Sequence, residues 1–206
     1  MIRVALIVEG EGECSAVPVL IRRIAATLNP GLSLDIRPVL RVSAAKLVRP
    51  GELERSIELA ARQVGKDGTI LVLLDCDDGC PAKEGPALLR RAQAARSDMD
   101  ISVVLAKREF EAWFLAAAES LRGCRGLPDD LQSPADPEAI RGAKEWLADR
   151  MPRTRRYAET SDQAAMCATF DMGQARRRAD SFDKCYREIV RLLATNIQVA
   201  VDDTRC

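Results

Sequence analysis

Three carboxylates follow a short apolar run in the middle of the chain. The run covers Ile70–Leu74 between two glycines, and a run this short is typical of a strand that is buried on both faces. The carboxylates that follow it are Asp75, Asp77 and Asp78. Alternation along an extended chain would place Asp75 and Asp77 on the same side, which is the spacing that two carboxylates need to share a divalent cation. An acidic turn that caps the next helix is the alternative interpretation.

Two further groups of acidic residues follow other predicted strands. One group follows Ile2–Val8 and consists of Glu9, Glu11 and Glu13; the other follows Ile101–Ala106 and consists of Glu109 and Glu111. Because the carboxyl ends of parallel strands meet at one edge of a sheet, we expect the three groups to converge. Like charges packed that closely raise one another's pKa unless cations neutralise them. The convergence therefore predicts a metal site, although helix starts also favour acids, which is the alternative for Glu109 and Glu111.

Strands alternate with helices along the first half of the chain. A strand is predicted over 32–40, and apolar residues at helical spacing predict helices over 15–28, 52–64 and 87–95. This alternation predicts an α/β fold with a parallel sheet of about four strands flanked by helices. A helix starting near Phe110 would bury a stripe of apolar residues, so its aromatic side chains are expected in the core. The stripe is Phe110, Trp113, Phe114, Ala117 and Leu121.

The chain changes character after residue 122. Residues 1–122 are predicted to form the α/β domain, and 123–194 a helical appendage packed on it, with helices over 137–149, 161–169, 171–179 and 181–194. Asp171 and Ser181 are expected to cap the last two of these helices. Residues 195–206 are expected to form a loose tail.

The amino-acid composition excludes several classes of catalytic and metal site. The 206 residues are 47% hydrophobic and 30% charged, as in globular proteins. The absence of histidine excludes histidine bases, Ser-His-Asp triads and histidine-ligated metals. Seven scattered cysteines without a C-x-x-C pair argue against a disulfide framework and a structural zinc site. The expected metal is therefore a hard cation on oxygen ligands, such as magnesium, manganese or calcium. No signal-peptide core or membrane span is recognisable, which predicts a cytoplasmic protein.

Basic residues are concentrated in the second half of the chain. The 31 basic and 31 acidic residues of the whole chain balance to zero, but Lys and Arg outnumber Asp and Glu by 12 to 8 over residues 141–191. Such a region beside an acidic site could hold a nucleic-acid backbone, and a solvated helical face is the alternative. The candidates are Arg153, Arg155, Arg156, Arg176, Arg177 and Arg178.

Four segments together resemble a known family. They are VEGEGE at 8–13, LLDCDD at 73–78, KREFEAWFL at 107–115 and DMGQARRRADSFDK at 171–184. The first two resemble the TOPRIM signature of topoisomerases, primases and overcoming-lysogenization-defect nucleases. All four, over about residues 2–194, resemble a bacterial TOPRIM-like family catalogued as domain of unknown function forty-two seventy-six, whose genes often lie beside an ATP-binding-cassette-type ATPase. The resemblance implies a Rossmann-like parallel sheet that binds magnesium and cleaves or transfers phosphodiesters.

The resemblance also implies roles for individual acids. Glu9 matches the TOPRIM glutamate, and Asp75 and Asp77 match its aspartate pair. Glu13 and Glu111 match further acids of the family pattern, with Glu109 as an additional candidate. Neither tyrosine is placed for a topoisomerase-type covalent link, because Tyr157 and Tyr186 both lie in the basic region.

Two-metal hydrolysis of nucleic acid is the predicted activity. The expected ligands of Mg²⁺ or Mn²⁺ are Glu9, Glu13, Asp75, Asp77, Glu109 and Glu111. Lys107 could neutralise developing charge on the phosphate, or form a salt bridge within the acidic group. The expected context is an antiphage nuclease that works with an ATPase on DNA or RNA.

Two other classes stay open. One is a catalytically silent metal-binding or docking module of an ATPase complex. The other is a haloacid-dehalogenase-type phosphatase in which Asp75 would be the nucleophile. The position of the Asp-x-Asp pair after the third strand, rather than the first, counts against the phosphatase.

Overall fold

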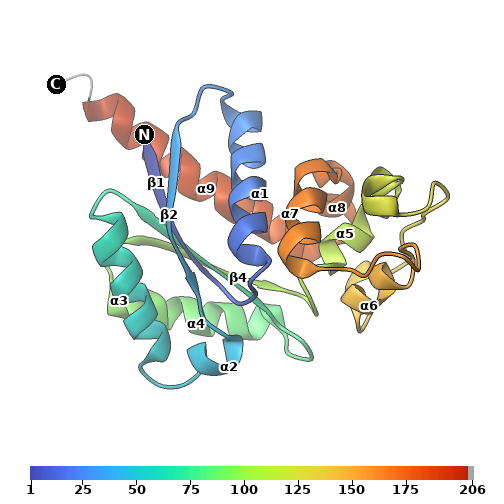
Figure 1. The fold of residues 1–206 in the computed structure, drawn as a ribbon. Helices are drawn as coiled ribbons and strands as arrows, with labels where there is room; N and C mark the ends of the chain where they lie inside the picture. The colour runs from blue at the N-terminus through green and yellow to red at the C-terminus, as the bar shows by residue number, and fades with distance from the viewer. Residues whose placement is uncertain (204–206) are drawn as a thin grey trace.

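A four-stranded parallel sheet lies at the centre of the protein (Figure 1). The computed structural model describes residues 1–203, with side chains described through Thr195. The strands are β1 (Ile2–Val8), β2 (Leu34–Arg41), β3 (Thr69–Asp75) and β4 (Asp100–Ala106), in the order β2-β1-β3-β4. All neighbouring strands are parallel. The predicted α/β class and four-stranded parallel sheet are therefore confirmed.

Helices cover both faces of this sheet. The helices α1 (Glu13–Leu28) and α9 (Asp180–Asp203) pack on one face. The other face is covered by α3 (Glu52–Val64) and α4 (Pro81–Ala95), beside the short α2 (Ala44–Leu47). Alternate residues of each strand enter the two cores, so that Leu71 and Leu73 face α1 while Val72 and Leu74 face α3. Burial on both faces explains why these strands are continuous apolar runs.

The order of the strands reverses beside β1. The chain moves from β1 to β2 on one side, and then returns to place β3 and β4 on the other side. In open parallel sheets, ligands bind outside the carboxyl ends of the strands at such a switch point. The loops after β1 and β3 both start there, because Val8 pairs with Leu73 in the register of the two strands.

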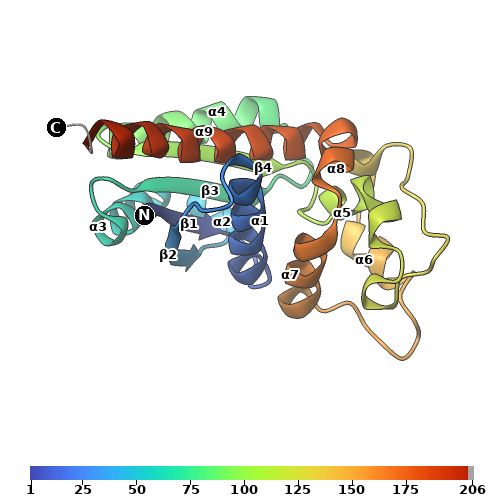
Figure 2. The ribbon, with the colours of Figure 1, turned by 90° about the horizontal axis from the view of Figure 1, so that it is seen from above.

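The remaining helices lie beyond the carboxyl ends of the strands, at the right of Figure 2. They are α5 (Ala112–Ala116), η1 (Ala118–Leu121), η2 (Cys124–Gly126), η3 (Pro137–Ala139), α6 (Ala143–Ala148), α7 (Glu159–Thr169) and α8 (Met172–Arg178). A buried network of aromatic rings joins α5 to α9 and to the end of α7, with ring centroids 4.8–5.5 Å apart. The rings belong to Phe110, Trp113, Phe114, Phe170 and Phe182. The predicted burial of the Phe110 stripe is confirmed.

Three predicted features of the second half differ from the structure. The helix α9 continues to Asp203, so residues 195–203 are helical rather than loose, and residues 204–206 lie outside the described part. Because α9 packs on the sheet, it is part of the α/β core rather than of an appendage. The helix predicted over 137–149 is divided, since Gly142 has a φ of 72° between η3 and α6.

Within residues 1–203, none of the helices combines the length and apolarity needed to cross a bilayer.

Ser181 holds α9 against the end of β4 instead of capping a helix. It lies inside α9, and its Oγ accepts hydrogen bonds from the backbone N–H of Lys107 (3.1 Å) and from Nε1 of Trp113 (2.8 Å). Asp171, in contrast, caps α8 as predicted, since its side chain accepts from the N–H of Gln174.

We expect Ser181→Ala to destabilise the protein. The substitution leaves the Trp113 and Lys107 donors without an acceptor, and an unsatisfied buried donor costs about 1–3 kcal/mol. Urea unfolding would measure the change. Ser161→Ala is the control because its hydroxyl is exposed and bonds only to the nearby Ala158 carbonyl. Equal stability of the two variants would contradict the role of Ser181.

Candidate functional site

Four carboxylates gather at the switch point of the sheet. This carboxylate cluster consists of Glu9 after β1, Glu13 at the start of α1, Asp75 at the end of β3 and Glu111 before α5. Asp75 lies close enough to the other three to feel their charges, and Glu13 feels those of Glu111 and Glu9. The predicted convergence of acids that follow the first, third and fourth strands is therefore present in the structure.

Burial and mutual repulsion make this cluster hard to ionise. Glu13 is 3% exposed and Glu111 is 0% exposed. Burial raises the pKa of Glu13 to about 7, against hydrogen bonds from the backbone of Gly10 and Glu9. Burial, and then the charges of Glu13 and Glu111, raise the pKa of Asp75 well above its usual value. Burial also raises the pKa of Glu111.

Backbone N–H groups hold one oxygen of three of these carboxylates. Glu9 Oε1 accepts from the N–H of Ala44 at the start of α2 (3.0 Å). Glu13 Oε2 accepts from the N–H groups of the loop after β1, at 3.0 and 3.3 Å. Asp75 Oδ1 accepts from the N–H of Phe110 (2.8 Å). These bonds fix the carboxylates to the ends of the strands.

Side chains from a distant part of the chain hold the fourth carboxylate. Glu111 Oε1 accepts from the hydroxyl of Tyr157 and from Nε2 of Gln163, both at 2.8 Å. Although burial alone would lower the pKa of Lys144, the charges of Glu111, Glu159 and Asp75 raise it above its usual value. Its ammonium also forms an ion pair with Glu159 (3.3 Å). Sequence reasoning missed Lys144, Tyr157 and Gln163, since no local motif surrounds them.

Within the described residues, two oxygens of the cluster have no hydrogen-bond partner. Glu9 Oε2 and Glu111 Oε2 are both buried without a hydrogen-bond donor. Such atoms are rare because a buried acceptor without a partner is costly, and a cation would satisfy both. An all-oxygen donor set suits a hard divalent cation. In the part of the chain that the structure describes, however, no three acidic or cysteine side chains are arranged to hold an ion as they stand. The carboxylate oxygens are suitable ligands for a cation, and binding the cation would require the carboxylate side chains to rotate.

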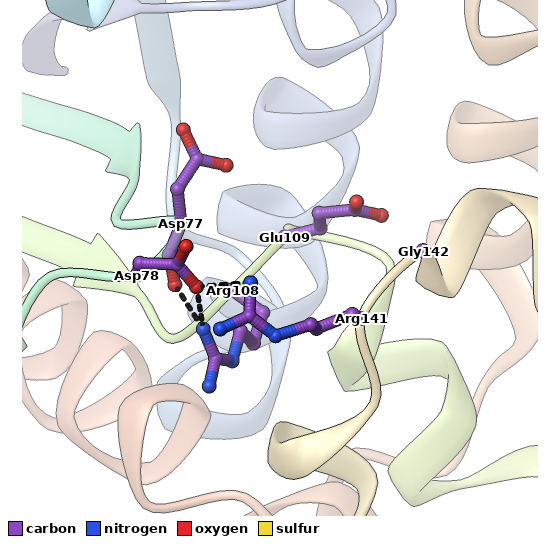
Figure 3. Close-up of a pocket in the computed structure, with 6 residues that line it drawn as sticks. All are labelled: Asp77, Asp78, Arg108, Glu109, Arg141 and Gly142. Carbon is purple, nitrogen blue, oxygen red and sulfur yellow. Dashed lines mark hydrogen bonds and ion pairs between the residues drawn. The ribbon is translucent and has the colours of Figure 1, made fainter.

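Asp77 is separated from the cluster. The strand β3 ends at Asp75, and Asp77 has a φ of 38° and an exposed side chain. The alternation that would pair it with Asp75 therefore does not continue, and that predicted pairing is not formed. Asp77 instead lines a neighbouring cavity of about 320 Å³ together with Asp78, Arg108, Glu109, Arg141 and Gly142 (Figure 3).

Two other predicted site residues, Glu109 and Lys107, form neither a hydrogen bond nor an ion pair with the carboxylate cluster in the described part of the chain. Glu109 Oε2 accepts from the backbone N–H of Lys144 (3.1 Å), at the start of α6. Lys107 has an exposed side chain, for which the described residues provide neither an ion pair nor a hydrogen bond; only its backbone N–H is bonded, to Ser181. Lys144 occupies the position beside the carboxylates that was expected for Lys107. Glu11 is exposed and pairs with Arg41 (3.2 Å).

Half of the predicted nucleic-acid-binding arginines are engaged in pairs within the protein. Arg155 contacts the buried Asp162. Arg176 pairs with Asp183 (2.9 Å), and Arg178 with Glu119 (2.8 Å). The other three have exposed side chains; they are Arg153, Arg156 and Arg177. The six arginines thus do not form a uniformly free basic surface.

The helices α1 and α7 approach each other closely at Gly12. A Cβ at this position would clash with Oε1 of Gln163 and with the carbonyl of Glu159. The approach matters for the cluster because Gln163 and Tyr157 hold Glu111 from the α7 side.

We expect Gly12→Ala to destabilise the protein by about 1–3 kcal/mol, since an added methyl in a close-packed contact forces the neighbouring backbone to move. Urea unfolding would measure the loss. Gly85→Ala serves as the control because, apart from its chain neighbours and the backbone of its own helix, no atom lies within 4 Å of its Cβ position. A neutral Gly12→Ala variant would contradict the close approach of α7.

Glu13→Gln should stabilise the metal-free protein at alkaline pH. Unfolded Glu13 releases its proton near its ordinary pKa of 4.5, whereas the folded protein retains it to about pH 7. The folded state therefore holds an extra proton between these values, and stability falls as the pH rises through them. At about pH 8 the stability of the variant should exceed that of the wild type by at most about 3 kcal/mol, and below about pH 4 the difference should vanish.

Thermal unfolding in a chelator at both pH values checks this expectation. Glu11→Gln removes the same charge from an exposed position but keeps Glu13, so its stability should follow the pH dependence of the wild type. The burial argument fails if Glu13→Gln retains the pH dependence of the wild type.

Comparison with known protein families gives one match, which covers most of the chain. The family model described as Domain of unknown function (DUF4276) matches residues 8–189, which include the whole carboxylate cluster. Searches of curated proteins and of solved structures returned no match. The chain belongs to the DUF4276 family.

Proposed function

We propose that this protein is a TOPRIM-type nuclease that hydrolyses phosphodiester bonds with Mg²⁺ or Mn²⁺. The observation that carries the proposal is the convergence of four carboxylates at the switch point, two of which have a buried oxygen without a partner. A purely structural acidic cluster would be expected to satisfy those oxygens with donors from the protein.

The ligands of the proposed site follow from the cluster. Glu9, Glu13, Asp75 and Glu111 would hold one cation, and Asp77 and Glu109 line the adjacent cavity where a second could be held. A bound divalent cation supplies an acidified water and neutralises charge on the phosphate. Tyr157 and Gln163 orient Glu111 by fixing one of its two oxygens.

A second cavity lies between α6 and the start of α7, beside two of the groups that interact with Glu111. Its volume is about 430 Å³, and its lining includes Lys144 and Tyr157, which both interact with Glu111. Lys144 is the cation best placed to attract a phosphate here. It takes the role that sequence reasoning gave to Lys107.

The proposed substrate is nucleic acid, and the proposed partner is an ATP-binding-cassette-type ATPase. The exposed Arg153, Arg156 and Arg177 could contact the backbone of DNA or RNA. A chain with zero net charge binds a polyanion weakly, so dependence on a partner is expected. An ATPase-linked antiphage role is the biological context that we propose.

One observation favours a different function, a catalytically silent docking module of an ATPase complex. Although four carboxylates lie together, no three acidic side chains among the described residues are arranged to hold a metal ion as they stand. In this alternative the cluster would keep its protons and serve the fold alone.

Titration with Mn²⁺ followed by cleavage assays separates these functions. Asp75→Asn and Glu111→Gln should each weaken Mn²⁺ binding by more than about tenfold in calorimetry, because each removes a charged ligand from the site. Both should also abolish cleavage of plasmid, linear DNA and tRNA, tested with and without the ATPase. Asp130→Asn, at an exposed position, is the control.

Each result of the Mn²⁺ titration and the cleavage assay favours one of these functions. Unchanged Mn²⁺ affinity in both variants would overturn the ligand assignment. Metal binding without cleavage under any condition would favour a silent metal-binding module, and no binding at all would favour the docking module.

A further inference from the structure

Two arginines converge on one aspartate in the cavity beside the carboxylate cluster. Arg141 Nη1 lies 2.6 Å from Asp78 Oδ1, and Arg108 Nη1 contacts the same oxygen. Figure 3 shows both guanidinium groups directed at Asp78, while the side chains of Asp77 and Glu109 point away from them. The cavity thus has a cationic side occupied by a single carboxylate.

This pair of arginines is not fully satisfied by Asp78. The Nε of Arg108 is buried, and none of the described residues accepts a hydrogen bond from it. The side chain of Arg108 is 24% exposed and that of Arg141 is 69% exposed, so Arg108 is part of the cavity wall and Arg141 reaches the cavity from the solvent side. Planar guanidinium groups bind the oxygens of carboxylates and phosphates in the same way, so an anion with more oxygens than Asp78 could engage both arginines more completely.

The backbone around the cavity is held in an unusual conformation. Asp77 and Arg108 have φ values of 38° and 67°, and they are two of the three non-glycine residues with positive φ among those described. They brace each other, since the N–H of Asp77 donates to the carbonyl of Arg108 (3.1 Å) and Arg108 Nη1 donates to the carbonyl of Asp77 (3.0 Å). Strain of this kind persists where the surrounding structure fixes the position of a functional group.

We propose that Arg108 and Arg141 bind a phosphate group of the substrate, and that Asp78 occupies this position until the substrate displaces it. The inference rests on the proposed function for its choice of a phosphodiester substrate. The cavity is the one that Asp77 and Glu109 line, so a phosphate held by the two arginines would lie beside the proposed metal ligands.

Asp78 thereby acts as an internal competitor. The cavity has three acids, Asp77, Asp78 and Glu109, against two arginines, so it carries one negative charge in excess. Removing the charge of Asp78 balances the cavity and frees both guanidinium groups. The affinity for a phosphate backbone should therefore rise when Asp78 is neutralised, and the gain should depend on Arg141.

Fluorescence anisotropy with a short fluorescein-labelled single-stranded DNA, in EDTA and low salt, tests this dependence without metal or hydrolysis. Asp78→Asn should bind the probe about tenfold more tightly than the wild type, since one charge-assisted competitor is removed. Arg141→Gln should weaken binding, and the double variant should lose most of the gain. Inorganic phosphate should compete more effectively with the probe in Asp78→Asn than in the wild type.

Arg90→Gln, which removes an equal charge from the exposed side of α4, is the matched control. Both test positions are more than half exposed, so the variants should fold, which thermal unfolding would verify. The proposal is overturned if Asp78→Asn binds no better than the wild type, or if Arg90→Gln weakens binding as much as Arg141→Gln. Cleavage that persists in Mn²⁺ without any arginine dependence would overturn the phosphate site alone. Binding as expected without cleavage would overturn the nuclease alone.

Discussion

Burying several carboxylates beside one another is costly, and this protein does so at the carboxyl ends of β1 and β3. The charges of Glu13, Asp75 and Glu111 repel, and little water is present to screen them. The surrounding elements each contribute a compensating group. Backbone N–H groups come from the loop after β1 and from the starts of α2 and α5, and Lys144 comes from α6. The positions of the helices beyond the sheet are therefore tied to the charges that they must compensate.

The sheet and the aromatic network make this arrangement rigid. The parallel register of β1 and β3 sets the spacing between Glu9 and Asp75, while the rings around Trp113 connect the start of α5 to α9. Ser181 completes that connection by accepting hydrogen bonds from both Lys107 and Trp113. A precise site on loops needs such a scaffold, because loops alone do not hold side chains within fractions of an ångström.

The features that sequence reasoning predicted well are those encoded locally. Apolar runs marked the strands, and the acids that follow them converge because parallel strands end at one edge. The predicted pairing of Asp77 with Asp75 is wrong, because Asp77 has a positive φ and its N–H bonds to the carbonyl of Arg108, which no local sequence pattern indicates. Tyr157 and Gln163 reach Glu111 from 46 and 52 residues away, so only the folded chain reveals them. The prediction ends the last helix at residue 194, but no glycine or proline follows before residue 204, and α9 continues to Asp203.

Anomalous diffraction from crystals soaked in Mn²⁺ tests the central claim most directly. The account predicts an anomalous peak within coordination distance of Glu9 Oε2 and Glu111 Oε2, the two buried oxygens that lack a partner. It also predicts that rotation of the side chains of Glu13 and Asp75 accompanies the peak. Crystals that show no peak at the carboxylate cluster, at Mn²⁺ concentrations that saturate other magnesium-type sites, would contradict the account.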